Sequence, residues 1–252
     1  MVERVDRRVL GSVRLMDGAS GVPIARRLEI QARGLVLTFT RSGLYVIMRA
    51  DGLDAHVTTF DAPPPVPANQ SLPFTLTITD RQNQFMPRTA VIDLPRSFDP
   101  TAGVIDLQTP IDITLASGAA RPANPGWAVV EMRIRDTADF HVRGALIEVF
   151  PQGGGPRMAW GIANHHGEAR LPIMGLRPYR EVENDPADPD DNEIVTRETP
   201  VEVRATADPA AIWPADPDRL AGPDPTFRRA TLPLLALTPG RTDSATLVLD
   251  LS

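Results

Sequence analysis

The side chains best suited to metal or acid–base chemistry in this protein are its four histidines. His165 and His166 are adjacent, and adjacent residues point to opposite faces of a strand or diverge in a turn, so they seldom ligate one metal ion. No cysteine or suitably spaced histidine accompanies them. His56 and His141 stand alone, without a serine or an acid placed to activate a nucleophile. We therefore interpret the histidines as turn and strand-edge residues, assign no catalytic or metal-binding residue, and expect no enzymatic activity.

A second candidate for chemistry is the acidic segment 181–198. The segment is rich in carboxylates, which are the hard oxygen ligands that Ca²⁺ prefers. Against a calcium site, Pro186 and Pro189 constrain the segment, and it lacks the glycine that the sharp turn of a helix–loop–helix calcium loop requires. Carboxylates interrupted by prolines cannot bury themselves, so we expect a mobile, solvated surface loop, with calcium binding as the alternative.

Sugar binding is another alternative, because sugars stack on exposed aromatic rings. The supply is small: Trp127, Trp160 and Trp213 are the only tryptophans, and Tyr45 and Tyr179 the only tyrosines. Each tryptophan adjoins an apolar or alternating run, so we expect it in a core or a domain interface rather than on an open platform. The glycines at 153–155 precede no helix with a following lysine or serine, so they indicate a hairpin loop and not a phosphate cradle.

The overall composition excludes several classes of function. Cysteine is absent, which excludes disulfides and thiolate chemistry, and every one of the 26 basic residues is arginine. The net charge of −6 and the lack of a basic patch argue against nucleic-acid binding. No apolar stretch is long enough to span a membrane, and the first residues lack the apolar core of a secretory signal. We expect a cytoplasmic site of synthesis, no membrane insertion and no cofactor.

Apolar residues alternate with polar ones along most of the sequence, which predicts half-buried β-strands. Val130, Met132 and Ile134, for example, alternate with charged residues. The 26 prolines and 18 glycines favour short strands and ordered loops over long helices. We expect strands over residues 9–16, 28–32, 36–40, 44–49, 74–78, 91–94, 111–115, 130–135 and 145–149, strand within 160–174 on either side of a tight turn at 164–167, and one helical turn near 217–220.

Short strand and turn motifs occur in the same order in the two halves of the sequence. Five short matches are separated by about 124–136 residues, which is the spacing of a duplicated domain. We therefore expect an all-β protein of two tandem antiparallel β-sandwiches: residues 1–118, a linker at 119–126 within a Pro- and Gly-rich run, and residues 127–252. The matches are Gly11 with Gly144, 42–43 with 166–167, 75–78 with 201–204, 85–87 with 212–214, and 111–115 with 247–251.

Two sets of motifs resemble known families. The strand 144–150 and the turn and strand 161–171 resemble the carboxypeptidase-regulatory-like, or transthyretin-like, β-sandwich. The stretches 80–88, 93–96, 126–130 and 160–175 resemble two-sandwich proteins encoded among the structural genes of phage-tail-like contractile injection systems, with Met86 where that family has leucine. The resemblance implies a structural component of a particle, and it supplies no catalytic residue.

These observations lead to a functional hypothesis. We expect a non-catalytic structural or adaptor component of a larger assembly, of the contractile injection particle type, that binds other protein subunits and is either a monomer or a homo-oligomer. A carbohydrate- or calcium-binding module is the alternative. The candidate interface anchors combine large apolar residues with proline, and core packing is the competing explanation for them. They are Phe85, Met86, Pro87, Ile212, Trp213 and Pro214.

Overall fold

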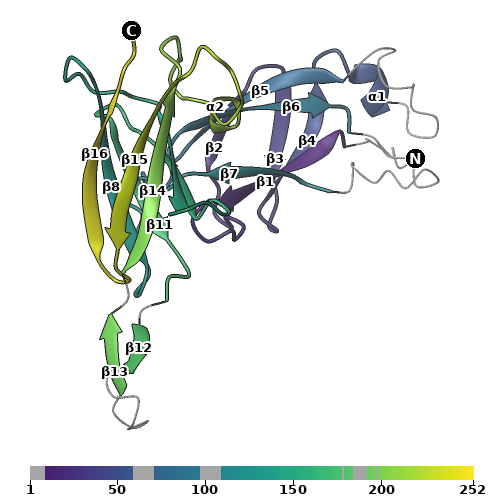
Figure 1. Cartoon of the computed structure of the whole chain (residues 1–252). Helices are drawn as coiled ribbons and strands as arrows, with labels where there is room; N and C mark the ends of the chain where they lie inside the picture. Colours follow the sequence, from purple (N-terminus) through teal and green to yellow (C-terminus); the bar gives the residue numbers. More distant parts are fainter. Residues whose placement is uncertain (1–8, 59–70, 97–108, 178, 184–191, 197) are drawn as a thin grey trace. The chain divides into compact units, whose positions relative to one another are not determined.

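The computed structural model describes residues 9–58, 71–96, 109–177, 179–183, 192–196 and 198–252 (Figure 1). As the alternating pattern predicted, the protein is all-β, with two short helices among the described residues. It divides into two compact units. Unit 1 comprises Met1–Asp17, Gly21–Arg81 and Pro87–Leu115, and unit 2 comprises Gly18–Ser20, Gln82–Met86 and Ala116–Ser252.

The described part of unit 1 contains two sheets. The first has the strand order β3-β4-β1-β7 and the second the order β2-β5-β6. All of these pairs are antiparallel except β1 with β7, which is parallel. The elements are β1 (Gly11–Asp17), β2 (Glu29–Ala32), β3 (Leu35–Phe39), β4 (Leu44–Ala50), α1 (Asp54–Thr58), β5 (Leu72–Thr79), β6 (Arg88–Leu94) and β7 (Ile111–Leu115).

The described part of unit 2 contains two larger sheets and a separate hairpin. The sheets have the orders β10-β9-β14-β15 and β11-β8-β16, and β12 pairs with β13. Among these strands, only β8 and β16 pair in parallel. The elements are β8 (Ala128–Asp136), β9 (Leu146–Pro151), β10 (Ala159–Ile162), β11 (Glu168–Ile173), β12 (Tyr179–Glu183), β13 (Asn192–Thr196), β14 (Thr199–Ala207), α2 (Pro217–Leu220), β15 (Arg228–Leu237) and β16 (Thr242–Leu249).

The alternating apolar residues form the core of each unit. In unit 1, Val13 and Leu15 of β1 are fully buried, and so is Ile47 of β4. In unit 2, Ile134 of β8 and Ile147 of β9 belong to one cluster that both sheets supply. Since successive side chains of a strand point to opposite faces, one apolar face per sheet is enough to close a sandwich. The prediction of β-sandwich domains is confirmed.

The two units share a pairing scheme. In each, the first strand (β1 or β8) pairs antiparallel with β4 or β11 and parallel with the last strand, β7 or β16. In each, β5 or β14 lies between two antiparallel neighbours, β2 and β6 or β9 and β15. Four of the five sequence matches therefore join corresponding strands or loops. The parallel pair was not expected, because alternation does not reveal strand direction.

The match of Gly11 with Gly144 is wrong. Gly11 opens β1, whereas Gly144 precedes β9, whose counterpart by pairing is β2. Both glycines have positive φ, 156° and 73°. A glycine is needed wherever the backbone takes such angles before a strand, so it does not identify which strand follows.

The acidic segment is more regular than expected. Its two ends form the antiparallel hairpin β12–β13, in which Glu181 pairs with Ile194. The β-branched residues Val182, Ile194, Val195 and Thr196 favour strand, and the acidic composition concealed this signal. Residues 184–191 lie outside the described residues, so the calcium hypothesis stays untested there. The Pro-rich residues 62–67 lie outside them too.

Helices play a small part in the described residues. The helical turn expected near 217–220 is α2, which Asp216 caps by accepting a hydrogen bond from the Asp218 N–H. Helix α1 was not expected, since a single turn leaves no periodic pattern. Neither helix has the length or hydropathy needed to cross a membrane.

The first residues of the run 117–126 are held by backbone hydrogen bonds to residues 83–84. Within unit 2, the Gly118 N–H donates to the Gln84 carbonyl (2.8 Å) and the Ala120 N–H to the Asn83 carbonyl (3.1 Å). A Cβ at Gly118 would lie 2.3 Å from the Asn83 oxygen, so only glycine permits this approach. Local composition predicts a linker at 119–126 but does not show these hydrogen bonds to distant residues.

Candidate functional site

Two of the predicted anchors meet at a second apolar cluster in unit 2, separate from its main core. Met86 and Trp213, which are 127 positions apart in the sequence, both pack against this cluster, as does Trp160. The buried members are Ala116, Leu146, Ile162, Ala215, Leu220 and Phe227. Both segments were singled out from their apolar-Pro composition, and the structure brings a residue of each to the same place.

Trp213 is held in place from several sides. Its ring lies against the imidazole of His165, with centroids 4.7 Å apart. Gly144 lies next to the indole, since a Cβ there would be 3.9 Å from the ring, an ordinary van der Waals distance. Before it, the Asp208 carboxylate accepts from the Ala210 N–H (2.8 Å). The segment carrying Trp213 is therefore fixed by packing and by a local turn.

Ile212, the residue before Trp213, is exposed to solvent. It is 85 % exposed, the highest value among the large apolar residues that the structure describes as exposed. Pro214, on the other side of Trp213, is half-buried. A large apolar side chain that remains in water next to an anchored tryptophan is the feature expected of a docking point.

The first predicted segment behaves differently. Phe85 is only 3 % exposed, and the Arg121 guanidinium lies 5.0 Å from the centre of its ring. Phe85 also forms a β-bridge with Ser117. Met86 and Pro87 are half-buried. Core packing therefore accounts for Phe85, and of the six predicted anchors Ile212 is the one that is fully presented to solvent.

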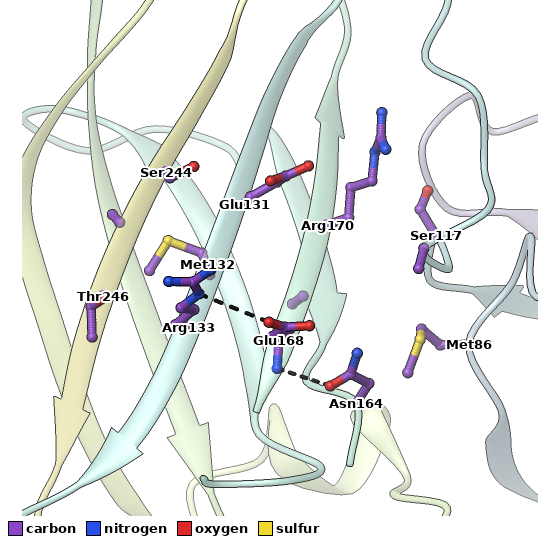
Figure 2. Close-up of a pocket in the computed structure, with 13 residues that line it drawn as sticks. Met86, Ser117, Glu131, Met132, Arg133, Asn164, Glu168, Arg170, Ser244 and Thr246 are labelled. Carbon is purple, nitrogen blue, oxygen red and sulfur yellow. Dashed lines mark hydrogen bonds and ion pairs between the residues drawn. The ribbon is translucent and has the colours of Figure 1, made fainter. Parts of the chain in front are cut away.

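A polar pocket of about 390 Å³ in unit 2 adjoins the second apolar cluster at Met86 and lies over the outward face of the sheet β11-β8-β16 (Figure 2). Glu131 and Arg133 of β8 and Glu168 and Arg170 of β11 contribute charges to it. In register, Arg133 is opposite Glu168, and their charged atoms are 3.8 Å apart. Ser117 and Met86 also line this pocket.

Sequence reasoning did not single out the polar residues of this pocket. Glu131, Arg133 and Arg170 occupy the polar positions of alternating strands, which is the usual pattern of a solvated face. Ser117 belongs to a run interpreted as a linker. The signal appears only in three dimensions: Ser117 Oγ and Arg170 Nε are both buried and have no hydrogen-bond partner among the described residues.

Comparisons with known proteins do not place this protein in a family. No family model matches it, and no curated protein matches it. Solved structures that resemble it include GBS52, the minor pilin of Streptococcus agalactiae (6 % identity, 85 % of this chain and 66 % of that one, TM-score 0.24), and BcpA, the major pilin subunit of Bacillus cereus (8 %, 98 % and 61 %, 0.26). The Bacillus anthracis TIE protein matches with 8 % identity over 96 % of this chain and 51 % of its own, at a TM-score of 0.24.

These likenesses are weak. This chain spans about half to two thirds of the length of those structures, and the TM-scores are too low to support a functional argument.

The remaining candidates from the sequence occupy structural positions. His165 and His166 lie in the turn before β11, where the Asn164 side-chain oxygen accepts from the His166 and Glu168 N–H groups (2.8 and 3.0 Å). The prediction that they are turn residues is confirmed. Among the described residues, no three histidines or carboxylates gather as a metal site would require.

The tryptophans offer no open stacking platform. All three are half-buried. Trp160 packs against the second cluster, and the Arg157 guanidinium lies 5.6 Å from its ring centre. A sugar would have to displace that arginine, which also forms an ion pair with Glu148 (2.7 Å). The expectation that these tryptophans serve packing holds for Trp160 and Trp213.

Proposed function

We propose that this protein is a non-catalytic structural or adaptor subunit of a larger protein assembly, and that the assembly is a phage-tail-like contractile injection particle. The observation that carries the adaptor role is the exposure of Ile212 beside the anchored Trp213. The motifs at 80–88, 126–130 and 160–175, through their resemblance to proteins of such particles, support the kind of assembly.

The energetics favour Ile212 as the contact point. Burying a fully exposed isoleucine contributes about 1.5–3 kcal/mol to association. Because Trp213 and the turn at Asp208 already hold the segment, docking would order little additional backbone, which keeps the entropic cost of binding low. A few such residues supply most of the affinity of a typical interface.

The partners in this proposal are other protein subunits, which include further copies of this protein in a homo-oligomer. The net charge of −6 supports protein partners over nucleic acid, because phosphate binding needs a concentrated positive surface. In this proposal the protein is made in the cytoplasm and is then carried as part of the particle.

The proposal is tested by sedimenting contractile particles from cells of the source organism that produce the protein with Ile212 intact or changed to Asp. The wild-type protein should sediment with the particles, and Ile212→Asp should remain in the supernatant. Phe140→Asp is the matched control, because Phe140 is 70 % exposed on a turn of the same unit. A wild-type protein that never sediments, or an Ile212→Asp variant that sediments normally, contradicts the proposal.

A further inference from the structure

The polar pocket over β11-β8-β16 contains two buried hydrogen-bond donors that have no acceptor among the residues the structure describes. Ser117 is 3 % exposed, and its Oγ has no partner in the part of the protein that the structure describes. Arg170 is half-buried, and its Nε atom is buried and likewise has no partner among the described residues. Buried polar groups are nearly always paired, because an unpaired one costs about 1–3 kcal/mol. Two such donors at one pocket make it a candidate site for a bound acceptor.

The other pocket residues do not supply this acceptor. Glu131 is directly opposite Arg170 in the strand register, but no hydrogen bond or ion pair joins the two described side chains. Glu168 faces Arg133 instead. Figure 2 shows Arg170 extending from β11 on the side of the pocket where Ser117 lies.

The charges of the pocket restrict the kind of acceptor. Two arginines and two glutamates give the charged lining a formal sum of zero. A multiply charged anion such as phosphate would meet stronger repulsion from Glu131 and Glu168 than a singly charged carboxylate would. A single carboxylate can pair with the planar guanidinium of Arg170, whose geometry matches it, and accept from the hydroxyl of Ser117. The volume, about 390 Å³, is within the range of small-ligand sites.

We propose that this pocket binds a carboxylate of a partner protein, either an acidic side chain or the C-terminus of the partner, through Arg170 and Ser117. The inference rests on the proposed function only in taking the carboxylate from a partner protein, and it names a second contact, distinct from Ile212. Ser244 and Thr246 of β16 line the same pocket and offer hydroxyls to the backbone of the bound segment.

The test is a titration of the ¹⁵N-labelled full-length protein with three capped peptides, followed by NMR. The peptides are acetyl-Gly-Gly-Asp-Gly-amide, acetyl-Gly-Gly-Gly with a free C-terminus, and the neutral acetyl-Gly-Gly-Asn-Gly-amide. We expect saturable shifts of the Arg170 Nε–Hε signal with at least one carboxylate peptide, which identifies the source, and none with the neutral peptide. Equal shifts with the neutral peptide, or no shift with either carboxylate, would overturn the inference.

Variants separate binding from structure. Arg170→Gln should weaken binding of the carboxylate peptide about tenfold or more. Arg170→Lys should not restore this affinity, because a lysine ammonium cannot form the two parallel hydrogen bonds that a guanidinium makes with a carboxylate. Arg143→Gln, which removes an exposed charge outside the pocket, should leave affinity unchanged.

Ser117→Ala should lower affinity several-fold while leaving the unfolding midpoint unchanged or higher, because its hydroxyl has no partner to lose among the described residues. A lower midpoint with unchanged affinity would show a purely structural serine.

The two proposals fail separately. Ile212→Asp should bind the carboxylate peptide normally, since Ile212 is not among the residues that line the pocket. Absence of peptide binding in a protein that still sediments with particles refutes only the carboxylate site. Peptide binding by a protein that never joins a particle refutes only the adaptor role.

Discussion

The indole of Trp213 lies against the imidazole of His165, with ring centroids 4.7 Å apart and ring planes inclined at 59°. The two residues come from the segment after β14 and from the turn before β11. Their contact fixes the position of the adjacent residue, Ile212, whose side chain is in solvent. One residue of the pair Ile212–Trp213 thus serves stability and the other is available for docking, and the two roles can be separated by mutation.

Trp213→Ala should destabilise unit 2 by about 2–3 kcal/mol, because the half-buried ring packs against the second cluster and its removal leaves a cavity. Urea denaturation followed by circular dichroism measures this loss. A change below about 0.5 kcal/mol would show that the ring contributes no packing.

Ile212→Asp should leave the free energy of unfolding within about 0.5 kcal/mol of the wild type, since an exposed side chain has few contacts to lose. The same denaturation series provides the comparison with Trp213→Ala. Destabilisation of similar size in both variants would mean that Ile212 is a packing residue and would remove the basis of the adaptor proposal.

Gly167→Ala should destabilise by about 3 kcal/mol or more, because Gly167 has a φ of 68° and a Cβ there would lie 2.5 Å from the Ile134 carbonyl oxygen. The matched control is Gly240→Ala. Gly240 has a φ of 76° but open space around its Cβ position, so only the backbone strain of about 1–2 kcal/mol applies. Thermal melting of both variants tests the difference, and equal losses would contradict the close approach at Gly167.

Arg14 and Asp112 join the parallel strands β1 and β7 by two hydrogen bonds of 2.7 and 2.8 Å. The hydrogen bond from Arg14 lowers the pKa of the Asp112 carboxyl below its usual range. The pair therefore stabilises the fold above the unfolded pKa of about 3.9, and this contribution is lost as the pH falls through the lower folded value. Since both side chains are partly exposed, the effect should be small.

Comparing Asp112→Asn with the wild type in urea at several pH values tests this prediction. The wild type should be the more stable at pH 7, and the difference should shrink below the unfolded pKa and disappear once the pH has fallen through the lower folded pKa of Asp112. A difference that is independent of pH over this range would show that ionisation of Asp112 does not contribute to stability.

Much of the fold could be predicted because alternation is a local property. Val13 and Leu15, or Val130 and Met132, show a buried face without knowledge of the partner strand. The parallel pairs β1–β7 and β8–β16 could not be predicted, since they depend on which distant strands meet. The hairpin β12–β13 was concealed by the acidic composition around it.

The candidate sites were less visible. Ile212 and Trp213 are neighbours of similar apolar character, so composition could not tell that one is packed and the other exposed. Arg170 has the ordinary pattern of an outward-facing strand residue, and Ser117 that of a connecting segment. Their missing hydrogen-bond partners are a property of the assembled sheet, as far as the structure describes it.

The adaptor role is tested most directly by a photo-crosslinking amino acid placed at position 212, with position 140 as the control, in cells that assemble the particle. The proposal predicts a crosslink from position 212 to a protein subunit of the particle and none from position 140. A protein labelled at position 212 that crosslinks to no particle subunit, in cells where particles assemble normally, would contradict it.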